Sequence, residues 1–307
     1  MDIEHVPVLL AETLQFLEPQ RGGLFVDCTI GLGGHAQALL EASPAARVLG
    51  IDRDEQALAR ARRRLAPFAD RVRLVRGDFG RLAELAAEAG ADRVAGVIAD
   101  LGVSSLQLDT PERGFSFRFE APLDMRMGGD GMTAREVLEA YSEDELARVF
   151  RRYGEERDAR RIARAVVERR RQAPLASTAE LRELIHRVKG SRRREGRVDP
   201  ATRVFQALRI EVNRELAELD ALVDQAVELL APGGRLVVLS YHSLEDRLVK
   251  NRLKDLARGE IDPVTGRPRE ETRLIEVLTR RPVRPRPEET QANPRARSAR
   301  LRAARRI

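Results

Sequence analysis

Four aspartates are the side chains best placed for chemistry in this sequence, because each one follows a short apolar run. Asp27 follows the run at 24–26, and Asp52, Asp78 and Asp100 come after similar runs further along. Each run predicts a buried strand, since it is short and bounded by turn-forming residues. One acid at a strand end often only caps the next helix. Four in succession favour a ligand that offers hydroxyl groups, amines and a positive centre.

A glycine-rich turn directly follows the first of these strands. Gly31, Gly33 and Gly34 precede a segment from His35 with the pattern of a helix. Because glycine has no Cβ and adopts positive φ angles, the backbone here can approach a ligand closely, and the free amides of the helix start face it. The spacing Gly31-x-Gly33-x-x-Ala36 also fits a dinucleotide-binding fingerprint. The glycines alone therefore leave a nicotinamide-dependent oxidoreductase open.

The apolar runs alternate with helical patterns, which predicts a mostly parallel sheet. Strands are expected at 24–26, 47–51, 72–75, 94–99 and 235–239, with two more near 274–279 and 301–304. Ligands of open α/β sheets bind outside the carboxyl ends of the strands, where the aspartates fall. Carboxylates would repel a pyrophosphate there. S-adenosylmethionine suits them, with its ribose at Asp52, its adenine near Asp78 and Phe79, and its ammonium group near the first and fourth strands.

The strand pattern is interrupted after the fourth strand by a long segment of different character. Residues 105–131 are irregular, and capping-box sequences then begin at Thr133, Ser142 and Ser177. We therefore predict an α/β domain in two parts, 1–103 and 205–307, interrupted by an all-α insertion at 104–204. One long helix is expected from Thr202 to Leu230, ended by Pro232-Gly233-Gly234.

Positive charge is concentrated in three places, although the formal net charge is only +6. Residues 157–171 carry seven arginines, residues 187–203 carry six arginines and a lysine, and residues 280–307 carry ten arginines against two glutamates. Such a run is often only a solvated helix face. Three runs made almost wholly of arginine favour a polyanionic partner, because the guanidinium fork matches phosphate bidentately.

Composition excludes several other classes of protein. No apolar run approaches the ~20 residues of a membrane helix, and the N-terminal segment lacks the basic region of a secretory signal. Cys28 is the one cysteine of the sequence and there are four histidines, so neither a disulfide framework nor a structural zinc site is expected. We expect a cytoplasmic protein without a membrane partner. The sequence leaves the oligomeric state open, a homodimer included.

Several motifs together resemble the bacterial ribosomal RNA small subunit methyltransferase H family. They are HVPVLL from His5, DCTIGLGGH from Asp27, IDRD from Ile51, DLGVSSLQLD with RGFSF from Asp100, PLDMRM from Pro122 and SYHSLEDR from Ser240. The resemblance implies a Rossmann-like S-adenosylmethionine-dependent methyltransferase fold, doubly wound and mostly parallel, with an inserted all-α substrate-recognition domain. It implies methyl transfer from S-adenosylmethionine to the exocyclic N4 of a cytidine in 16S ribosomal RNA, in the decoding region near the P site. The partner would be 16S ribosomal RNA or the small ribosomal subunit.

The resemblance also implies roles for individual residues. Cofactor contacts are expected from Gly33, Gly34, His35, Asp52, Phe79, Asp100 and Gln107. Asp100 is the expected hydrogen-bond acceptor for the target amine, with Asp124 and His242 as further catalytic candidates. Many amino-methyltransferases have two prolines and an aromatic residue after this acid, whereas this chain has Leu101-Gly102-Val103. An aromatic residue that stacks on the base must then come from elsewhere, and the candidates are Phe115, Phe117 and Tyr241.

Two further interpretations remain open from the sequence. One is a non-catalytic RNA-binding protein on a methyltransferase fold, which the intact aspartates and glycines disfavour. The other is a methyltransferase for a small molecule or a protein, which the arginine clusters disfavour.

Overall fold

The computed structural model describes residues 7–190 and 199–307. The chain divides into two compact units, a sheet unit made of Met1–Gly102 and Leu216–Ile307 and a helical unit made of Val103–Glu215. The first two residues of the HVPVLL motif and the middle of the arginine cluster at 187–203 lie outside the described residues.

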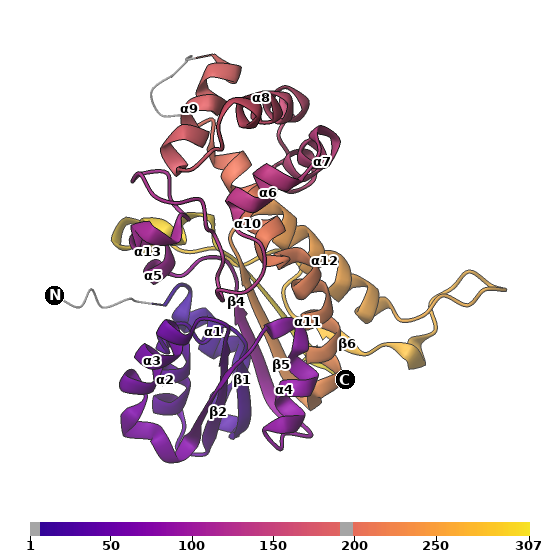
Figure 1. Cartoon of the computed structure of the whole chain (residues 1–307). Coiled ribbons are helices and arrows are strands. Elements are labelled where there is room, and N and C mark those ends of the chain that lie inside the picture. The colour runs from indigo at the N-terminus through magenta and orange to yellow at the C-terminus, as the bar shows by residue number, and fades with distance from the viewer. Residues whose placement is uncertain (1–6, 191–198) are drawn as a thin grey trace. The chain divides into compact units, whose positions relative to one another are not determined.

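The sheet unit contains seven strands in the order β3-β2-β1-β4-β5-β7-β6 (Figure 1). The strands are β1 Gly23–Asp27, β2 Ala46–Asp52, β3 Val72–Arg76, β4 Val94–Asp100, β5 Leu230–Ser240, β6 Ile275–Val277 and β7 Arg300–Arg306. Strands β1 to β5 are parallel to their neighbours, and β7 runs antiparallel between β5 and β6. The predicted doubly wound, mostly parallel α/β sheet is confirmed.

Helices cover both faces of this sheet because alternate strand residues point to opposite sides. The helices of the sheet unit are α1 Leu10–Leu17, α2 Gly34–Ala42, α3 Glu55–Arg64, α4 Leu82–Glu88, α12 Ser243–Arg258 and α13 Pro287–Ala292, together with α11 Glu215–Leu229, which begins at the last residue of the helical unit. Phe25 of β1 packs in the core that includes α2 and α3. Its neighbour Val26 packs in the opposite core, with α4, α11 and α12.

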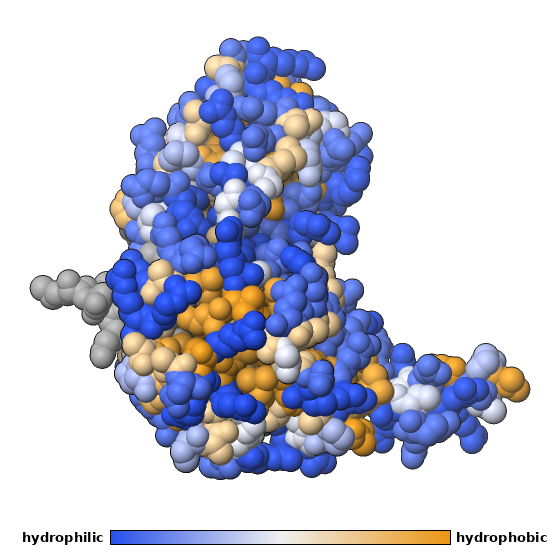
Figure 2. Space-filling view, turned by 60° about the horizontal axis from the view of Figure 1, so that its bottom comes forward, coloured by the Kyte–Doolittle hydropathy of each residue, from blue (hydrophilic) through white to orange (hydrophobic). Residues whose placement is uncertain are grey.

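The remaining elements are short 3₁₀ turns, and one arm projects between α12 and β6. The turns are η1 Pro19–Arg21, η2 Ala66–Arg71, η3 Phe79–Arg81, η4 Pro111–Arg113, η5 Glu270–Thr272 and η6 Pro294–Ser298. Figure 2 shows the arm between α12 and β6 standing out from a face that is mostly hydrophilic around a central hydrophobic area. Val264 in this arm is 91% exposed. Among the described residues, none of the helices is long and apolar enough to cross a bilayer.

The helical unit has a core of its own. Its helices are α5 Ser105–Asp109, α6 Ala134–Ala140, α7 Glu143–Gly154, α8 Ala159–Gln172, α9 Thr178–Lys189 and α10 Thr202–Asn213. The three predicted capping boxes form at the starts of α6, α7 and α9, each with both reciprocal hydrogen bonds. Leu138, Phe150, Ile162, Leu181 and Leu208 are among the buried residues of this core.

The structure differs from the sequence-based expectation around position 204. The expected single helix from Thr202 to Leu230 is two helices, because Arg214 adopts the left-handed conformation (φ 52°, ψ 30°) and ends α10. The expected boundary at 204 lies inside α10, whose Val204 and Leu208 are buried in the helical core. The helical unit therefore extends through Glu215. Residues 232–234 lie within β5 rather than between a helix and a strand.

Candidate active site

Three of the four predicted aspartates end neighbouring strands of the sheet. Asp27 is the last residue of β1, Asp52 of β2 and Asp100 of β4. Asp27 pairs in register with Gly50 on one side and Ile98 on the other, two residues before each of the other acids. Asp78 follows β3 after a single glycine. The parallel register thus brings the acids to one edge, which we call the acid edge.

The glycine turn is fastened to Asp52. The carboxylate accepts hydrogen bonds from the N–H groups of Gly31 (2.9 Å) and Asp54 (2.9 Å), one on each oxygen. Gly31 (φ 50°) and Gly33 (φ 80°) adopt the left-handed conformation, and Gly33 is the N-cap of α2. A Cβ on Gly34 would lie 2.5 Å from a side-chain carbon of Pro7. Each oxygen of Asp52 keeps a second lone pair, so the group can still accept hydroxyl donors from a ligand.

Burial changes the titration of the acid edge. Burial raises the pKa of Asp27 to about 7, against the hydrogen bond from the Thr29 N–H, and the charges of Asp100 and Asp52 raise it further. Burial likewise raises the pKa of Asp52 to about 6, against its two backbone hydrogen bonds. Buried carboxylates of this kind are stabilised in their charged form by a nearby cation. The acid edge therefore favours a positively charged ligand over a pyrophosphate.

Asp100 is held from two directions. Its Oδ1 accepts a hydrogen bond from the Tyr241 hydroxyl (2.7 Å), and its own N–H donates to the Thr29 hydroxyl (2.7 Å). Burial and the neighbouring charge of Asp100 raise the pKa of Tyr241 well above its ordinary value, so its hydroxyl stays protonated and acts as a donor. The Asp100 side chain remains 20% exposed. This arrangement fixes the carboxylate while leaving part of it accessible.

His35 lies beside Asp100 as an uncharged ring rather than as a charged partner. Its Nε2 lies 3.1 Å from the Val8 carbonyl oxygen, and burial lowers the pKa of His35 to about 4. We therefore assign the ring proton to Nε2, where it is donated to the carbonyl. The Nδ1 atom lies 3.9 Å from Asp100 Oδ2, and this approach is not an ion pair because the ring is uncharged.

The loop after β3 carries Asp78 and Phe79. Asp78 is paired with Arg53, whose Nε lies 2.8 Å from Oδ1, and the Arg53 guanidinium lies 5.8 Å from the centre of the Phe79 ring. Gln225 of α11 holds the same loop, because its Nε2 donates to the Gly80 carbonyl (2.6 Å) and its Oε1 accepts from the Ala83 N–H (2.8 Å). The role of Gln225 is not apparent from the sequence, since nothing in a helical pattern distinguishes a glutamine that holds a distant loop.

Comparison with known proteins identifies the chain. A model of the MraW methylase family matches residues 2–307. The chain belongs to the MraW methylase family. It is 50% identical over 305 residues to the "Ribosomal RNA small subunit methyltransferase H" of Sorangium cellulosum, covering 99% of this chain and 91% of that protein. It is also 50% identical over 305 residues to the protein of the same name from Gloeobacter violaceus, covering 99% of this chain and 88% of the relative.

Among solved structures, a Streptococcus mutans protein in complex with SAH overlaps with a TM-score of 0.46 at 13% identity, covering 99% of this chain and all (100%) of that one. As a member of the MraW methylase family the chain is a methyltransferase, and S-adenosylmethionine is its methyl donor. The acid edge suits this donor, which carries a sulfonium, an ammonium and a ribose diol.

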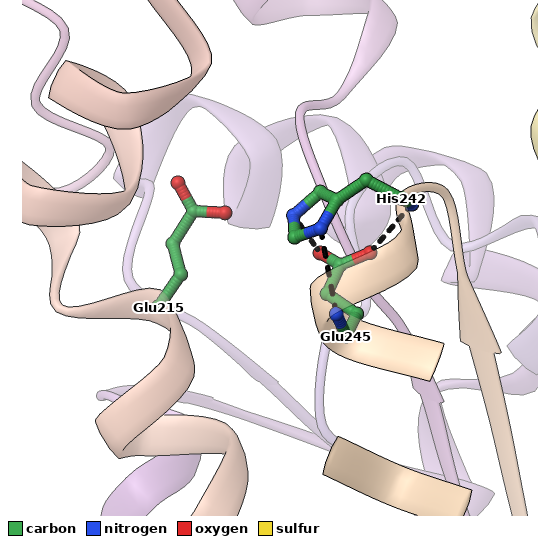
Figure 3. Close-up of side chains that lie close together, drawn as sticks. All are labelled: Glu215, His242 and Glu245. Atoms are coloured by element: carbon green, nitrogen blue, oxygen red, sulfur yellow. Dashed lines mark hydrogen bonds and ion pairs between the residues drawn. The ribbon is translucent and has the colours of Figure 1, made fainter. Parts of the chain in front are cut away.

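In this MraW methylase, His242 starts a helix. It is the N-cap of α12, and its Nδ1 accepts from the Glu245 N–H at 3.4 Å. The Glu245 carboxylate in turn accepts from the N–H groups of Tyr241 (2.8 Å) and His242 (3.2 Å). Figure 3 shows His242 lying against Glu245, with the contacts between these two residues as dashed lines. The contacts give His242 a structural role, and its catalytic role stays a prediction.

The remaining predicted site residues lie in the helical unit of the MraW methylase. Gln107 closes the capping box of α5, its Oε1 accepting from the Ser104 N–H at 3.0 Å. Arg126 donates to both oxygens of Asp124 at 2.8 Å. Burial by itself would raise the pKa of Asp124, but the hydrogen bonds and charge of Arg126 outweigh burial and hold that pKa below its ordinary value. A general base needs the opposite shift, so this environment disfavours Asp124 in that role.

Two of the three candidate stacking residues are engaged in packing. Phe115 is buried in the core of the helical unit. Phe117 packs edge-on against Phe205, with 4.9 Å between ring centres. Tyr241 lies at the acid edge, where its hydroxyl donates a hydrogen bond to Asp100.

Proposed function

We propose that this MraW methylase transfers a methyl group from S-adenosylmethionine to the exocyclic N4 of a cytidine in 16S ribosomal RNA, in the decoding region near the P site. The relatives named ribosomal RNA small subunit methyltransferase H, 50% identical over almost the whole chain, support the substrate class. The observation that carries the proposal of an amine target is Asp100, a partly exposed carboxylate fixed by Tyr241 at the end of β4.

The cofactor would be held by residues of the sheet unit. Asp52 accepts hydrogen bonds from the ribose hydroxyls, and Asp27 faces the cationic end. The amides of Gly33 and Gly34 approach the cofactor closely, since neither residue has a Cβ. Phe79 packs on the adenine face. When bound, S-adenosylmethionine would supply an electrophilic methyl group. His35 is a further proposed contact from the sheet unit, and Gln107, which belongs to the helical unit, is a proposed contact from the family resemblance alone.

The protein must compensate for a weak nucleophile. The N4 lone pair of cytidine is delocalised into the ring, so alignment of the amine with the methyl group matters, and alignment can contribute several kcal/mol. Asp100 accepts an N–H hydrogen bond from the amine and directs the remaining lone pair toward the methyl carbon. Transfer of the methyl group, with the neutral thioether as leaving group, costs the amine one proton, which Asp100 would accept and pass to water. A positioned base contributes roughly 10² to 10⁴-fold.

The target base must leave its stack to reach this edge. Extruding a nucleotide costs a few kcal/mol, which contacts elsewhere on the RNA offset. Asp124 and His242 remain proposals for a second proton acceptor, and the contacts described above favour Asp100 over both.

The test is mass spectrometry of small-subunit RNA from cells with and without this protein. N4-methylcytidine should disappear from one position in its absence, return with the wild-type chain, and stay absent with Asp100→Asn. Asp70→Asn, a change at an exposed acid in η2, is the matched control and should restore the mark. A mark that survives deletion of the protein, or disappearance of a methyl group from another base atom instead, would contradict the proposal.

A further inference from the structure

The segment between β6 and β7 carries positive charge that the protein does not use internally. Arg280, Arg281, Arg284, Arg286 and Arg297 are exposed, and none of them forms an ion pair within the described part of the chain. We call these five residues the arginine ridge. The arginines of β7 differ, since Arg300 and Arg302 both pair with Asp246 (3.3 Å and 2.6 Å).

The backbone under the arginine ridge is fixed. Val283 exchanges hydrogen bonds with Leu301 of β7 (3.0 Å and 2.9 Å). Ala296 and Ala299 are buried in the core on the α2 and α3 side of the sheet. Four prolines, at 282, 285, 287 and 294, restrict φ along the segment. Arginines on an ordered backbone lose less conformational entropy on binding than arginines on a flexible tail.

The arginine ridge borders the acid edge. Because β7 is antiparallel to β5, its first residue, Arg300, lies opposite Ser240 at the carboxyl end of β5. Glu289 of α13 accepts a hydrogen bond from the Leu9 N–H (2.7 Å), next to the Val8 carbonyl that His35 contacts. The charge of Glu289 also contributes to raising the pKa of Tyr241. The segment is therefore close to the residues that flank Asp100.

We propose that the arginine ridge binds the phosphate backbone of the RNA beside the target nucleotide, so that the sheet unit itself holds the substrate. This inference rests on the proposed function. The acid edge repels phosphate and accepts a base or a cation, whereas the arginines alongside it match phosphate oxygens. The negative acid edge thus accepts the target base, while the positive arginine ridge beside it binds the phosphates of the RNA backbone.

The test compares two double variants of the full-length chain. Arg284→Gln/Arg286→Gln removes two charges from the arginine ridge. Arg47→Gln/Arg93→Gln removes two exposed arginines at the amino ends of β2 and β4, the opposite ends of these strands from the acid edge. The probe is small-subunit ribosomal RNA transcribed in vitro, and its binding is measured between about 50 and 200 mM salt.

The Arg284→Gln/Arg286→Gln variant should bind RNA more weakly, and its slope of log affinity against log salt should be smaller by about 1.4, or ~0.7 for each single-strand phosphate that is no longer neutralised. Its KM for RNA should rise while its affinity for S-adenosylmethionine stays unchanged. The Arg47→Gln/Arg93→Gln variant should match the wild type. Equal slopes in all three proteins, or equally weakened binding in both variants, would overturn the inference. So would weaker binding to the assembled subunit alone, which would indicate a protein partner.

The readout separates this inference from the proposed function. If the wild type binds RNA with the expected slope but methylates no cytidine, the proposed function is wrong, while binding of RNA by the arginine ridge remains supported. If the wild type methylates cytidine and the ridge variant keeps the wild-type slope and KM, the inference about the arginine ridge is wrong, while the proposed function remains supported.

Discussion

Asp27 shows how burial at a single residue prepares a site for a cation. It accepts a hydrogen bond from the Thr29 N–H, yet burial still raises its pKa to about 7. A carboxyl group whose pKa is higher in the folded than in the unfolded state takes up a proton on folding. The contribution of Asp27 to stability is therefore greatest at low pH and falls as pH rises between about 4 and 7. At neutral pH the charged form of Asp27 is disfavoured by burial, and a cationic cofactor would stabilise it.

Asp27→Asn should consequently stabilise the folded protein at pH 8, by up to a few kcal/mol, because the amide keeps the acceptor for Thr29 and removes the buried charge. The gain should shrink toward zero as pH falls to about 4. Affinity for S-adenosylmethionine should weaken, since the facing charge is removed. Thermal melts across this pH range and calorimetric titrations measure the two effects. A variant that is less stable than the wild type at pH 8 would contradict the prediction.

Tyr241 is expected to act through Asp100 rather than by stacking on the base. Tyr241→Phe keeps the ring but removes the hydroxyl that orients the carboxylate, so kcat should fall about tenfold. Affinity for S-adenosylmethionine should not change. Steady-state kinetics with saturating cofactor measure the effect, and Tyr153→Phe on α7 is the matched control. A loss of RNA affinity at unchanged kcat would instead indicate stacking.

At the scale of elements, α11 connects two parts of the chain that are distant in sequence. Its Gln225 holds the loop that follows β3, and a Cβ on Gly80 of that loop would collide with the Glu218 carboxylate. The helix thus lies directly against the segment that carries Phe79. The position of the expected adenine site depends on this packing.

Gln225→Ala should raise the Kd for S-adenosylmethionine roughly five- to tenfold, because it leaves two backbone groups of the loop without their partner. The kcat at saturating cofactor should stay near the wild-type value. Glu228→Ala, an exposed change on the same helix, is the control. An unchanged Kd in Gln225→Ala would mean that the loop is held by its other contacts.

Some strands and helix ends of this fold could be predicted from the sequence, and others could not. The seven strands were predictable because buried strands form short apolar runs bounded by turn formers, and the starts of α6, α7 and α9 because a capping box is local. The end of α10 was not, since an arginine in the left-handed conformation carries no signal and the apolar periodicity continues past it. The positions of Asp52 and Asp100 followed from the strands. The contacts of Gln225 and Tyr241 depend on tertiary packing between distant segments.

At the scale of the whole molecule, each of the two units has its own buried core. The helical unit packs α6 to α10 around residues such as Phe150 and Leu208, without residues of the sheet unit in that cluster. A separate core of this kind is what an independently folding domain requires.

Residues 103–215, expressed alone, should therefore give a helical circular dichroism spectrum and a cooperative thermal transition. The fragment should not bind S-adenosylmethionine, because the acid edge belongs to the sheet unit. Phe150→Ala should lower its stability by about 3 to 5 kcal/mol, as expected for a large buried side chain. A broad, non-cooperative melt of the unmodified fragment would show that the helical unit depends on the rest of the chain.

The place of β7 has a consequence for synthesis of the protein. It pairs with β5 along Arg235–Ser240 and separates β5 from β6, although the ribosome makes it after both. Until residues 300–306 emerge, the apolar end of β5 is an open strand edge, and such edges pair readily with other chains. A nascent or truncated polypeptide that lacks this segment should aggregate even though every residue of the acid edge has already been made.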